Sequence, residues 1–452
     1  MKMKKRIVLA LCLVLVVLVT ACGDSAETVK HGKKRGSDPT QKKNENKEKD
    51  KDKMTPTPTP EELISLTLWS TAVQGDLYYS AYDRALREMK SRYPHICVTM
   101  AITPDTDDYK QKLKSSMESG STADIFLTWS CSFLEDFVRE DKVYCLDDMY
   151  QNYKDMLPEK MCRNFTFDGK KYGIPLNMSV VTLFANMEVL RSVGYTVVPT
   201  DKSQFFELCE KLVAHGITPF GCAGRDVETW CVMEYLEPIM VKTVGASTMD
   251  AILQGKASWD NEDIAWAMAH FLTFLNSGFF DAADKNRSND EVKERFMAGE
   301  YAFYQNGSWN CADFARCGVN IQACELPVFS NKSTRGQLVG GPNEALAVSA
   351  NSKNPEIAAQ YAFEFAHLIN TYVYLESAVI PSWKIDVDDS DVNYLTRQVY
   401  DMVVNSDYLV LYGDNLLKGK VLEFYFREVG KAFTGEIQDG ETFKQDMKRA
   451  SW

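Results

Sequence analysis

The stretch YKQKLKSSMESGSTADIFLTW, residues 109–129, contains a helix pattern, a stop signal and a strand pattern in direct succession. Residues 109–120 have the spacing of an amphipathic helix, and Gly120 is typical of the residue that ends one. The run DIFLTW at 124–129 is apolar enough to form a buried strand. A helix that leads within a few residues into a buried strand is the repeating unit of a layered α/β fold.

The same alternation extends toward the N-terminus. LISLTLWST at 63–71 predicts an opening strand, and ICVTMAI at 96–102 predicts a second one. Between them, residues 76–94 have a stripe of apolar residues at helical spacing and end in a proline. Strands that alternate with helices in this way predict an α/β lobe with a largely parallel sheet.

A second informative stretch is EYAFYQNGSWN at 300–310. It predicts a short strand, a turn at Asn306 and Gly307, which both tolerate positive φ, and then an exposed tryptophan, Trp309. A large apolar side chain placed just after a turn needs an explanation, because turn residues usually face water.

Further helices are predicted later in the chain. Ser288 and Glu291 have the spacing of a capping box, and Asn354-Pro355 is typical of a helix start. Residues 350–452 have a predominantly helical pattern.

The N-terminus has the organisation of a secretory signal. A basic start precedes a thirteen-residue apolar run at 7–19, which is shorter than the roughly 20 residues that span a bilayer. The run ends in VTAC, and small residues before Cys22 resemble the lipobox of bacterial lipoproteins. The resemblance implies that residues 1–21 are a signal peptide and that lipid on Cys22 anchors the protein to the extracytoplasmic face of the cell membrane. The alternative is an ordinary signal peptide.

Residues 22–60 are charged and then proline-rich, which predicts a disordered tether. Residues 1–60 carry a net charge of +7, and the whole chain carries −12, so residues 61–452 carry −19. This body is long enough for two lobes. Its acidic balance argues against nucleic acid as a partner.

The body contains no sequence motif for catalysis. Its four histidines are far apart, and it lacks the motifs of metalloproteases, serine hydrolases and nucleotide-binding enzymes. DVDDSD at 386–391 imitates the start of a calcium loop but lacks the required glycine and glutamate, so a solvated acidic loop is the better interpretation. We therefore expect no metal, no cofactor and no enzyme activity.

Ten cysteines follow Cys22 without any C-x-x-C motif. Most are expected to be buried thiols. Export permits disulfides, and a bridge such as Cys222–Cys231 or Cys311–Cys317 stays open at this point.

Two longer stretches resemble the extracellular solute-binding proteins, family 1 type, of carbohydrate-uptake ABC transporters. They are FDGKKYGIPLNMSVVTLFANMEVLRSVGY at 167–195 and ERFMAGEYAFYQNGSW at 294–309. The matching positions are Asp168, Gly169, Tyr172, Gly173, Pro175, Phe184, Asn186, Gly194, Phe296, Gly299, Ala302, Gly307 and Trp309. Phe303 departs from the usual methionine of the family. The resemblance covers nearly all of 61–370 and is weak beyond.

The resemblance implies a two-lobed, type II periplasmic-binding-protein-like α/β fold with three crossovers between the lobes and a helical C-terminal part. It places residues 61–175 and 310–346 in the N-terminal lobe and residues 176–309 and 347–452 in the C-terminal lobe. It also implies a monomer that captures a carbohydrate, in particular an oligosaccharide, between the lobes and delivers it to the permease subunits of an ABC transporter.

Sugars present C–H faces that stack on aromatic rings and hydroxyl groups that bind polar side chains. On this basis and on the resemblance, eight residues are predicted to bind ligand: Trp309, Trp230, Trp69, Trp129, Asp124, Asn177, Gly341 and Glu344. Trp69 and Trp129 are included because they end predicted strands, where open α/β sheets bind ligands. For each tryptophan the alternative is packing in the core, and for Asp124 it is a turn or cap.

Three other functions remain open from the sequence. A lipid-anchored glycoside hydrolase would need two carboxylates roughly 5–10 Å apart in the cleft. A ligand-binding module that presents its ligand to a membrane sensor would have the same sequence features as a transport protein. The third is a peptide or polyamine binder on the same scaffold.

Overall fold

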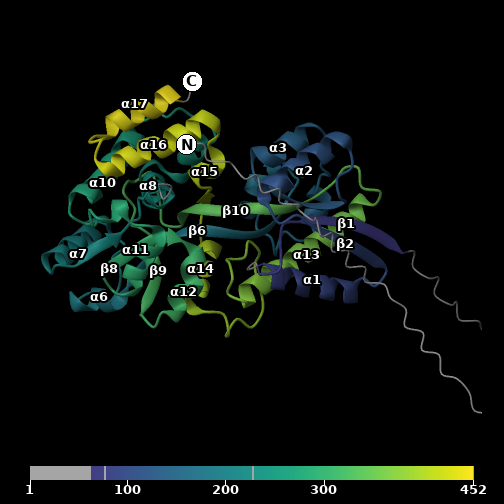
Figure 1. Ribbon diagram of the computed structural model, residues 1–452, viewed down its shortest axis with the longest axis horizontal. Helices are drawn as coiled ribbons and strands as arrows, with labels where there is room; N and C mark the ends of the chain where they lie inside the picture. Colours follow the sequence, from purple (N-terminus) through teal and green to yellow (C-terminus); the bar gives the residue numbers. More distant parts are fainter. Residues whose placement is uncertain (1–62, 76–77, 226–228, 451–452) are drawn as a thin grey trace, which may run out of the picture.

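The computed structural model describes residues 63–75, 78–225 and 229–450, which form two α/β lobes joined by one sheet (Figure 1). The strand order in this sheet is β2-β1-β3-β10-β6-β8-β7, with β11 beside β10 and β9 beside β6. The predicted signal peptide, the lipidation site Cys22 and the tether lie outside the described residues. Within the described ranges, no helix combines the length and apolar character needed to cross a bilayer.

The first lobe has the predicted alternation of strands and helices. Its parallel strands are β1 (Ile64–Ser70), β2 (Ile96–Ile102) and β3 (Ile125–Trp129). Its helices and short elements are α1 (Tyr79–Arg92), α2 (Thr106–Ser119), α3 (Ser132–Arg139), α4 (Asp147–Tyr150), α5 (Glu159–Cys162), η1 (Arg163–Phe165), β4 (Thr166–Phe167), β5 (Lys170–Lys171) and α13 (Pro355–Leu375). Helix α2 ends at Gly120 with φ 69°, as the glycine predicts.

Two long strands belong to both lobes. β6 (Ile174–Asn186) and β10 (Gln337–Val348) pair antiparallel to each other across the middle of the molecule (Figure 1). In the first lobe β10 pairs with β3, and in the second lobe it pairs with β11. The far half of β6 pairs with β8 and β9 in the second lobe.

A third crossover is the segment 376–393 between α13 and α14, and the backbone N–H of Met178 donates to the carbonyl of Ile380 within it. Three crossovers are therefore present among the described residues, as the predicted fold class requires.

The second lobe contains the remaining elements. They are α6 (Met187–Ser192), α7 (Lys202–Ala214), β7 (Thr218–Gly221), α8 (Thr229–Val244), α9 (Ala246–Leu253), α10 (Glu262–Asn276), η3 (Asp284–Asn286), α11 (Asn289–Met297), β8 (Tyr301–Gly307), η4 (Ser308–Asn310), α12 (Cys311–Arg316), β9 (Ile321–Cys324), α14 (Tyr394–Val404), β11 (Tyr408–Val410), α15 (Gly413–Leu416), α16 (Gly419–Thr434) and α17 (Gly440–Ala450). The capping box of Ser288 and Glu291 is formed at the start of α11. Except for the short β11, the C-terminal part is helical as predicted.

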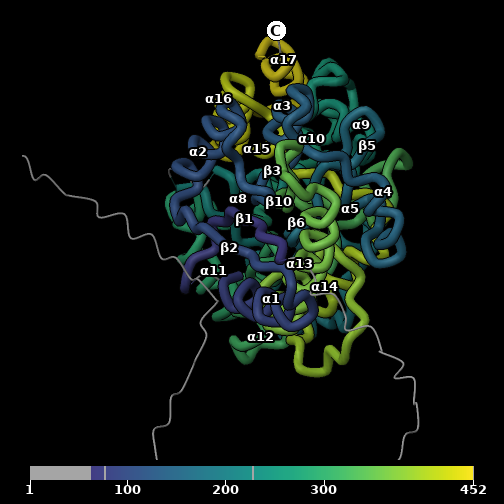
Figure 2. Tube along the Cα trace, turned by 90° about the vertical axis from the view of Figure 1, so that its right-hand side faces the viewer, coloured from purple at the N-terminus to yellow at the C-terminus, as the bar shows by residue number. Residues whose placement is uncertain are grey.

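The predicted lobe boundaries differ from the structure at two places. Residues 310–336 include α12 and β9, which pack with α14 and β6 in the second lobe and not in the first. Helix α13 packs along α1 in the first lobe, and Figure 2 shows the two helices side by side. The reason is that the chain changes lobe within β10, so helices on opposite sides of that strand in the sequence belong to different lobes.

All ten cysteines of the described residues are free thiols. The Sγ of Cys222 donates to the carbonyl oxygen of Cys231 at 3.8 Å and is not bridged to that residue. Burial raises the pKa of Cys131 to about 11 and that of Cys311 to about 12, so both are inert thiols at neutral pH.

Candidate functional site

The crossover strands form the floor of the site. Asn177 and Ser179 are two residues apart on β6, so their side chains point to the same face. The Asn177 amide donates to Glu344 Oε2 at 3.4 Å, and the Tyr412 hydroxyl donates to Ser179 Oγ at 3.1 Å. This face of β6 therefore has one polar contact toward each lobe.

An aromatic cluster stands on the side of the second lobe. Trp309 lies in η4 directly after β8, and its side chain is 41% exposed. Its ring centroid lies 6.1 Å from that of Trp230, at the start of α8, and 6.5 Å from that of Tyr412, just before α15. The structure thus brings two of the predicted stacking residues together and adds a third ring.

The prediction of a turn at Asn306 and Gly307 is wrong. β8 continues to Gly307, whose φ is −69°, and a 3-10 turn follows it. Glycine is needed there for a different reason: a Cβ would lie 2.1 Å from the ring of Trp309. Gly307 therefore leaves the space in which the indole lies against the backbone.

The two tryptophans of the first lobe are separate from this cluster. Trp129 ends β3, and Lys110 Nζ lies 4.5 Å from its ring centroid. Near the end of β1, Lys112 Nζ lies 4.0 Å from the ring centroid of Trp69. Each ring therefore already has an ammonium group over one face, and stacking of a sugar on that face requires the lysine to move.

Glu344 connects the floor to the first lobe. In β10 it lies opposite Trp129 of β3 and opposite Asn177 of β6. Burial raises the pKa of Glu344, while hydrogen bonds to Asn177 and Trp129 and the charge of Lys110 oppose this effect. Three of the predicted residues thus meet at one point, where the carboxyl group faces two hydrogen-bond donors.

Gly341 has a φ of +143°, which side-chain-bearing residues rarely adopt. It and Gly340 form the bend of β10 where that strand passes from one lobe to the other. Gly340 is the glycine that packs closely against β6, because a Cβ there would lie 2.3 Å from the carbonyl oxygen of Ser179. A contact of Gly341 with ligand stays a prediction.

A family model described as bacterial extracellular solute-binding protein matches residues 86–371. The chain belongs to this family. The members of the family bind solutes outside the cytoplasm, and they are binding proteins rather than enzymes.

Two comparisons place this solute-binding protein among its relatives. It is 23% identical over 229 residues to the maltodextrin-binding protein MdxE of Bacillus subtilis, an alignment that covers 48% of this chain and 51% of that protein. The chain thus spans about half the length of this curated relative. It is 28% identical, with a TM-score of 0.67, to a structure from work on xylan utilization by Caldanaerobius polysaccharolyticus, covering 85% of this chain and 99% of that one.

A third relative shows the fold alone. The apo form of RafE from Streptococcus pneumoniae is 17% identical, with a TM-score of 0.70 over 88% of this chain and 100% of that one. RafE in complex with raffinose gives a TM-score of 0.60 over 86% and 98% of the two chains.

The contacts of Asp124 favour the structural alternative, a turn or cap, over the predicted ligand-binding role. Asp124 precedes β3, at the end of the strand opposite Trp129 and the crossovers. Its Oδ2 accepts from the backbone N–H and the hydroxyl of Thr67 at 2.8 and 2.7 Å, and its Oδ1 accepts from Ser352 at 2.6 Å. The carboxylate therefore ties the middle of β1 and the start of β3 to the loop after β10.

Asp124→Asn is expected to lower the free energy of unfolding by about 1 kcal/mol at neutral pH and to leave ligand affinity unchanged. Burial alone would raise the pKa of Asp124, but hydrogen bonds from Ser352 and Thr67 lower it below its ordinary value. Its stabilising effect is thus present above the unfolded pKa and lost as pH falls through the folded one. Urea unfolding of both variants at neutral and acidic pH checks this; a difference that grows in acid would contradict it.

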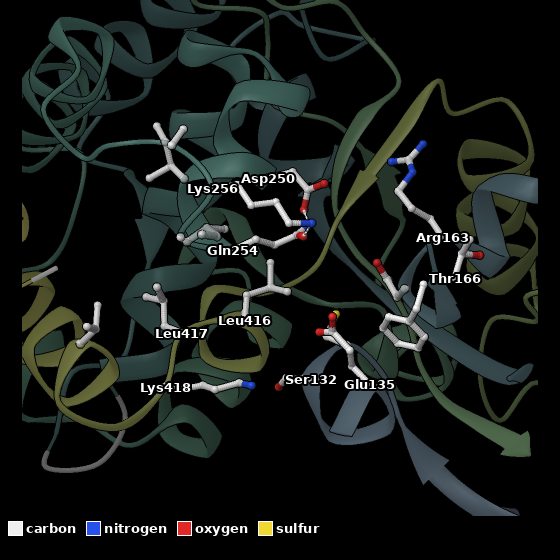
Figure 3. A pocket seen from close by; sticks show the side chains of 18 of the residues that line it. Ser132, Glu135, Arg163, Thr166, Asp250, Gln254, Lys256, Leu416, Leu417 and Lys418 are labelled. Carbon is white, nitrogen blue, oxygen red and sulfur yellow. Dashed lines mark hydrogen bonds between the residues drawn. The ribbon is translucent and has the colours of Figure 1, made fainter. Parts of the chain in front are cut away.

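A large cavity lies between the lobes, lined by residues of both. Its volume is about 1360 Å³, and it is lined by charged side chains from both lobes (Figure 3). Figure 3 shows Lys256 and Lys418 of the second lobe and Glu135 of the first lobe at this cavity. None of the eight predicted residues lines it, and its aromatic residues are only Phe167 and Trp259. The predicted stacking residues therefore lie in the cluster and not in the lining of this cavity.

Sequence analysis did not predict a role for Tyr412 or for the nearby acidic residues Glu237 and Asp414. Burial and the charge of Asp414 raise the pKa of Glu237 to about 8, while hydrogen bonds from Gly413 and Tyr425 lower it. These contacts hold the segment after β11 against α8. The available signal was YLVLYGD at 408–414, a strand-like run that ends in an aromatic residue and a glycine, inside a part of the chain predicted to be helical.

The described residues contain no group of three or more His, Cys, Asp or Glu side chains that would hold a metal ion.

Proposed function

We propose that this protein captures a carbohydrate, specifically an oligosaccharide, in the cleft between its lobes and delivers it to the permease of an ABC transporter. The observation that carries the proposal is the cluster of Trp309, Trp230 and Tyr412 beside the hydrogen-bonding floor of Asn177 and Glu344. Flat rings next to polar groups match the C–H faces and hydroxyl groups of a sugar. The names of the relatives, which refer to maltodextrin, xylan and raffinose, support the same ligand class.

Capture is expected to proceed by closure of the lobes. The aromatic cluster belongs to the second lobe, whereas Trp69 and Trp129 belong to the first. A sugar that contacts both sides has more interactions in the closed arrangement than in the open one, so its binding shifts the population toward closure. The closed form then presents a surface made by both lobes to the permease.

Lipid on Cys22 would hold the monomer at the membrane through the tether, residues 22–60. A tether raises the effective concentration of the protein at the permease. Stable anchoring needs more than one acyl chain. Radiolabelled palmitate incorporation that Cys22→Ser abolishes would support the anchor, and incorporation that persists in this variant would contradict it.

A thermal-shift panel tests the ligand class. We expect at least one of maltotriose, xylotriose and raffinose to raise the melting temperature by a few degrees, because a ligand at 100 times its Kd adds about 2.7 kcal/mol to the folded state. A tripeptide and spermidine serve as controls for the peptide and polyamine alternatives. A shift with a control and none with any sugar would overturn the proposal.

Chromatography of the incubated sugars tests the glycoside hydrolase alternative. It is expected to show no cleavage, and product formation would instead support the hydrolase.

A further inference from the structure

A buried carboxyl group next to the aromatic cluster has one oxygen without a hydrogen-bond partner among the described residues. Glu234 of α8 is 5% exposed, and its Oε2 has no partner among the described residues. Buried polar atoms are hydrogen-bonded in the great majority of cases, so each exception needs an explanation. A missing ligand is one such explanation.

The position of Glu234 along its helix points to the cluster. Trp230, Glu234 and Glu237 are spaced by four and three residues on α8, so their side chains share one face of the helix. Trp230 at one end of this row contacts the ring of Trp309. Glu237 at the other end accepts from the backbone N–H of Gly413 at 3.1 Å. Along the helix, Glu234 therefore lies between Trp230, which belongs to the aromatic cluster, and Glu237, which holds the residue after Tyr412.

The ionisable groups around Glu234 are acids and phenols. Glu237 lies on the same helix, Asp414 on α15, Tyr412 just before it and Tyr304 on β8. Burial raises the pKa of Glu234 well above its ordinary value, and the charges of Glu237 and Asp414 raise it further. Both effects favour the protonated form of this carboxyl group, which has one O–H donor and one carbonyl acceptor.

We propose that Glu234 is a specificity-determining residue of the cleft, whose carboxyl group exchanges hydrogen bonds with a neutral hydroxyl group of the bound sugar. This inference rests on the proposed function. A hydroxyl group donates and accepts, as the acid does, so both partners are satisfied. A uronate, sulfate or phosphate at this position would face three carboxyl groups, and an ammonium would require an ionised carboxylate.

The test is isothermal titration calorimetry with whichever of maltotriose, xylotriose and raffinose stabilises the wild-type protein most. Glu234→Gln keeps an uncharged donor and acceptor of similar shape, so its Kd is expected to stay within threefold of the wild-type value. Glu234→Ala removes both groups and is expected to raise Kd about tenfold. Glu423→Gln, on an exposed position of α16, is the matched control for loss of one glutamate and is expected to change nothing.

The outcomes separate this inference from the proposed function. If none of the three sugars binds the wild-type protein, the proposed function fails and the inference fails with it. If a sugar binds and Glu234→Ala leaves Kd within twofold, only the inference is overturned. It is also overturned if Glu234→Gln weakens binding as much as Glu234→Ala, because the carboxylate would then be the active form.

Infrared difference spectroscopy between wild type and Glu234→Gln at pH 7 gives a readout that does not depend on ligand. We expect a carbonyl band of a protonated carboxylic acid in the wild-type protein that is absent from the variant. A carboxylate band in its place would overturn the inference. The glutamine variant also shows by its melting temperature that the fold is retained.

Discussion

Trp309→Ala is expected to weaken sugar binding about a hundredfold, which corresponds to roughly 3 kcal/mol. The indole is 41% exposed at the crossover and has rings on two sides, so one face remains for stacking with a ligand. Tryptophan in such a position combines a large apolar area with a fixed geometry, and its truncation removes both. Calorimetric titration of both proteins with the best panel sugar measures the effect.

Trp266→Ala is the matched control for this variant. Trp266 is 48% exposed on α10, and its ring contact is with His270, remote from the crossover residues. Both variants are expected to lose about 1 kcal/mol of stability or less, because both side chains are largely at the surface. Equal affinities for Trp309→Ala and Trp266→Ala would show that the cluster is not the stacking site.

Gly340→Ala is expected to destabilise the protein by about 4 kcal/mol. The φ of Gly340 is +122°, and strain of this kind costs roughly 1–3 kcal/mol in a residue with a side chain. A Cβ would also lie 2.3 Å from the carbonyl oxygen of Ser179 and 2.5 Å from the Cα of Val180. Because these are backbone atoms, the clash can be relieved only by moving one crossover strand away from the other, at a further cost of about 1–3 kcal/mol.

Gly318→Ala separates the two contributions. Gly318 has a φ of +81°, but nothing lies within 4 Å of the position of its Cβ, so only the backbone strain of about 1–2 kcal/mol is expected. Urea unfolding of the two variants measures the difference. If Gly340→Ala costs no more than Gly318→Ala, the two strands can separate at this point without strain. Gly340→Ala is also expected to weaken sugar binding, because Ser179 holds the hydroxyl of Tyr412.

Local patterns in the sequence predicted β1, α1, β2, α2 and β3 of the first lobe correctly. The glycine after α2 and the capping box before α11 each act within a few residues of chain, and both are present in the structure. The same is true of the strands up to Trp129, and in β3 burial on both faces leaves a readable apolar run. The lobe assignment of α13 was not predictable in this way, since it depends on where the chain crosses within β10.

The candidate site was only partly predictable for a related reason. Trp309 and Trp230 were found because each follows or begins an element in a stretch that resembles the family. Tyr412 and Glu234 come together from positions 178 residues apart in the sequence, through contacts of Gly413 with α8. The role of Asp124 could not be decided from the sequence, because an aspartate before a strand looks the same whether it faces a ligand or a neighbouring loop.

The shared strands have a consequence for biosynthesis. β3 has β10 as one of its two neighbours, so the inner edge of the first lobe stays open until residues 344–348 have been made. The helix that packs along α1 comes later still, at Pro355–Leu375. Contacts this far apart in the chain form slowly, because a long loop must close before they stabilise anything. Most of the polypeptide can therefore leave the ribosome and pass through a secretion channel before either lobe is able to fold. For the same reason, neither lobe can be produced alone by cutting the gene at a single point.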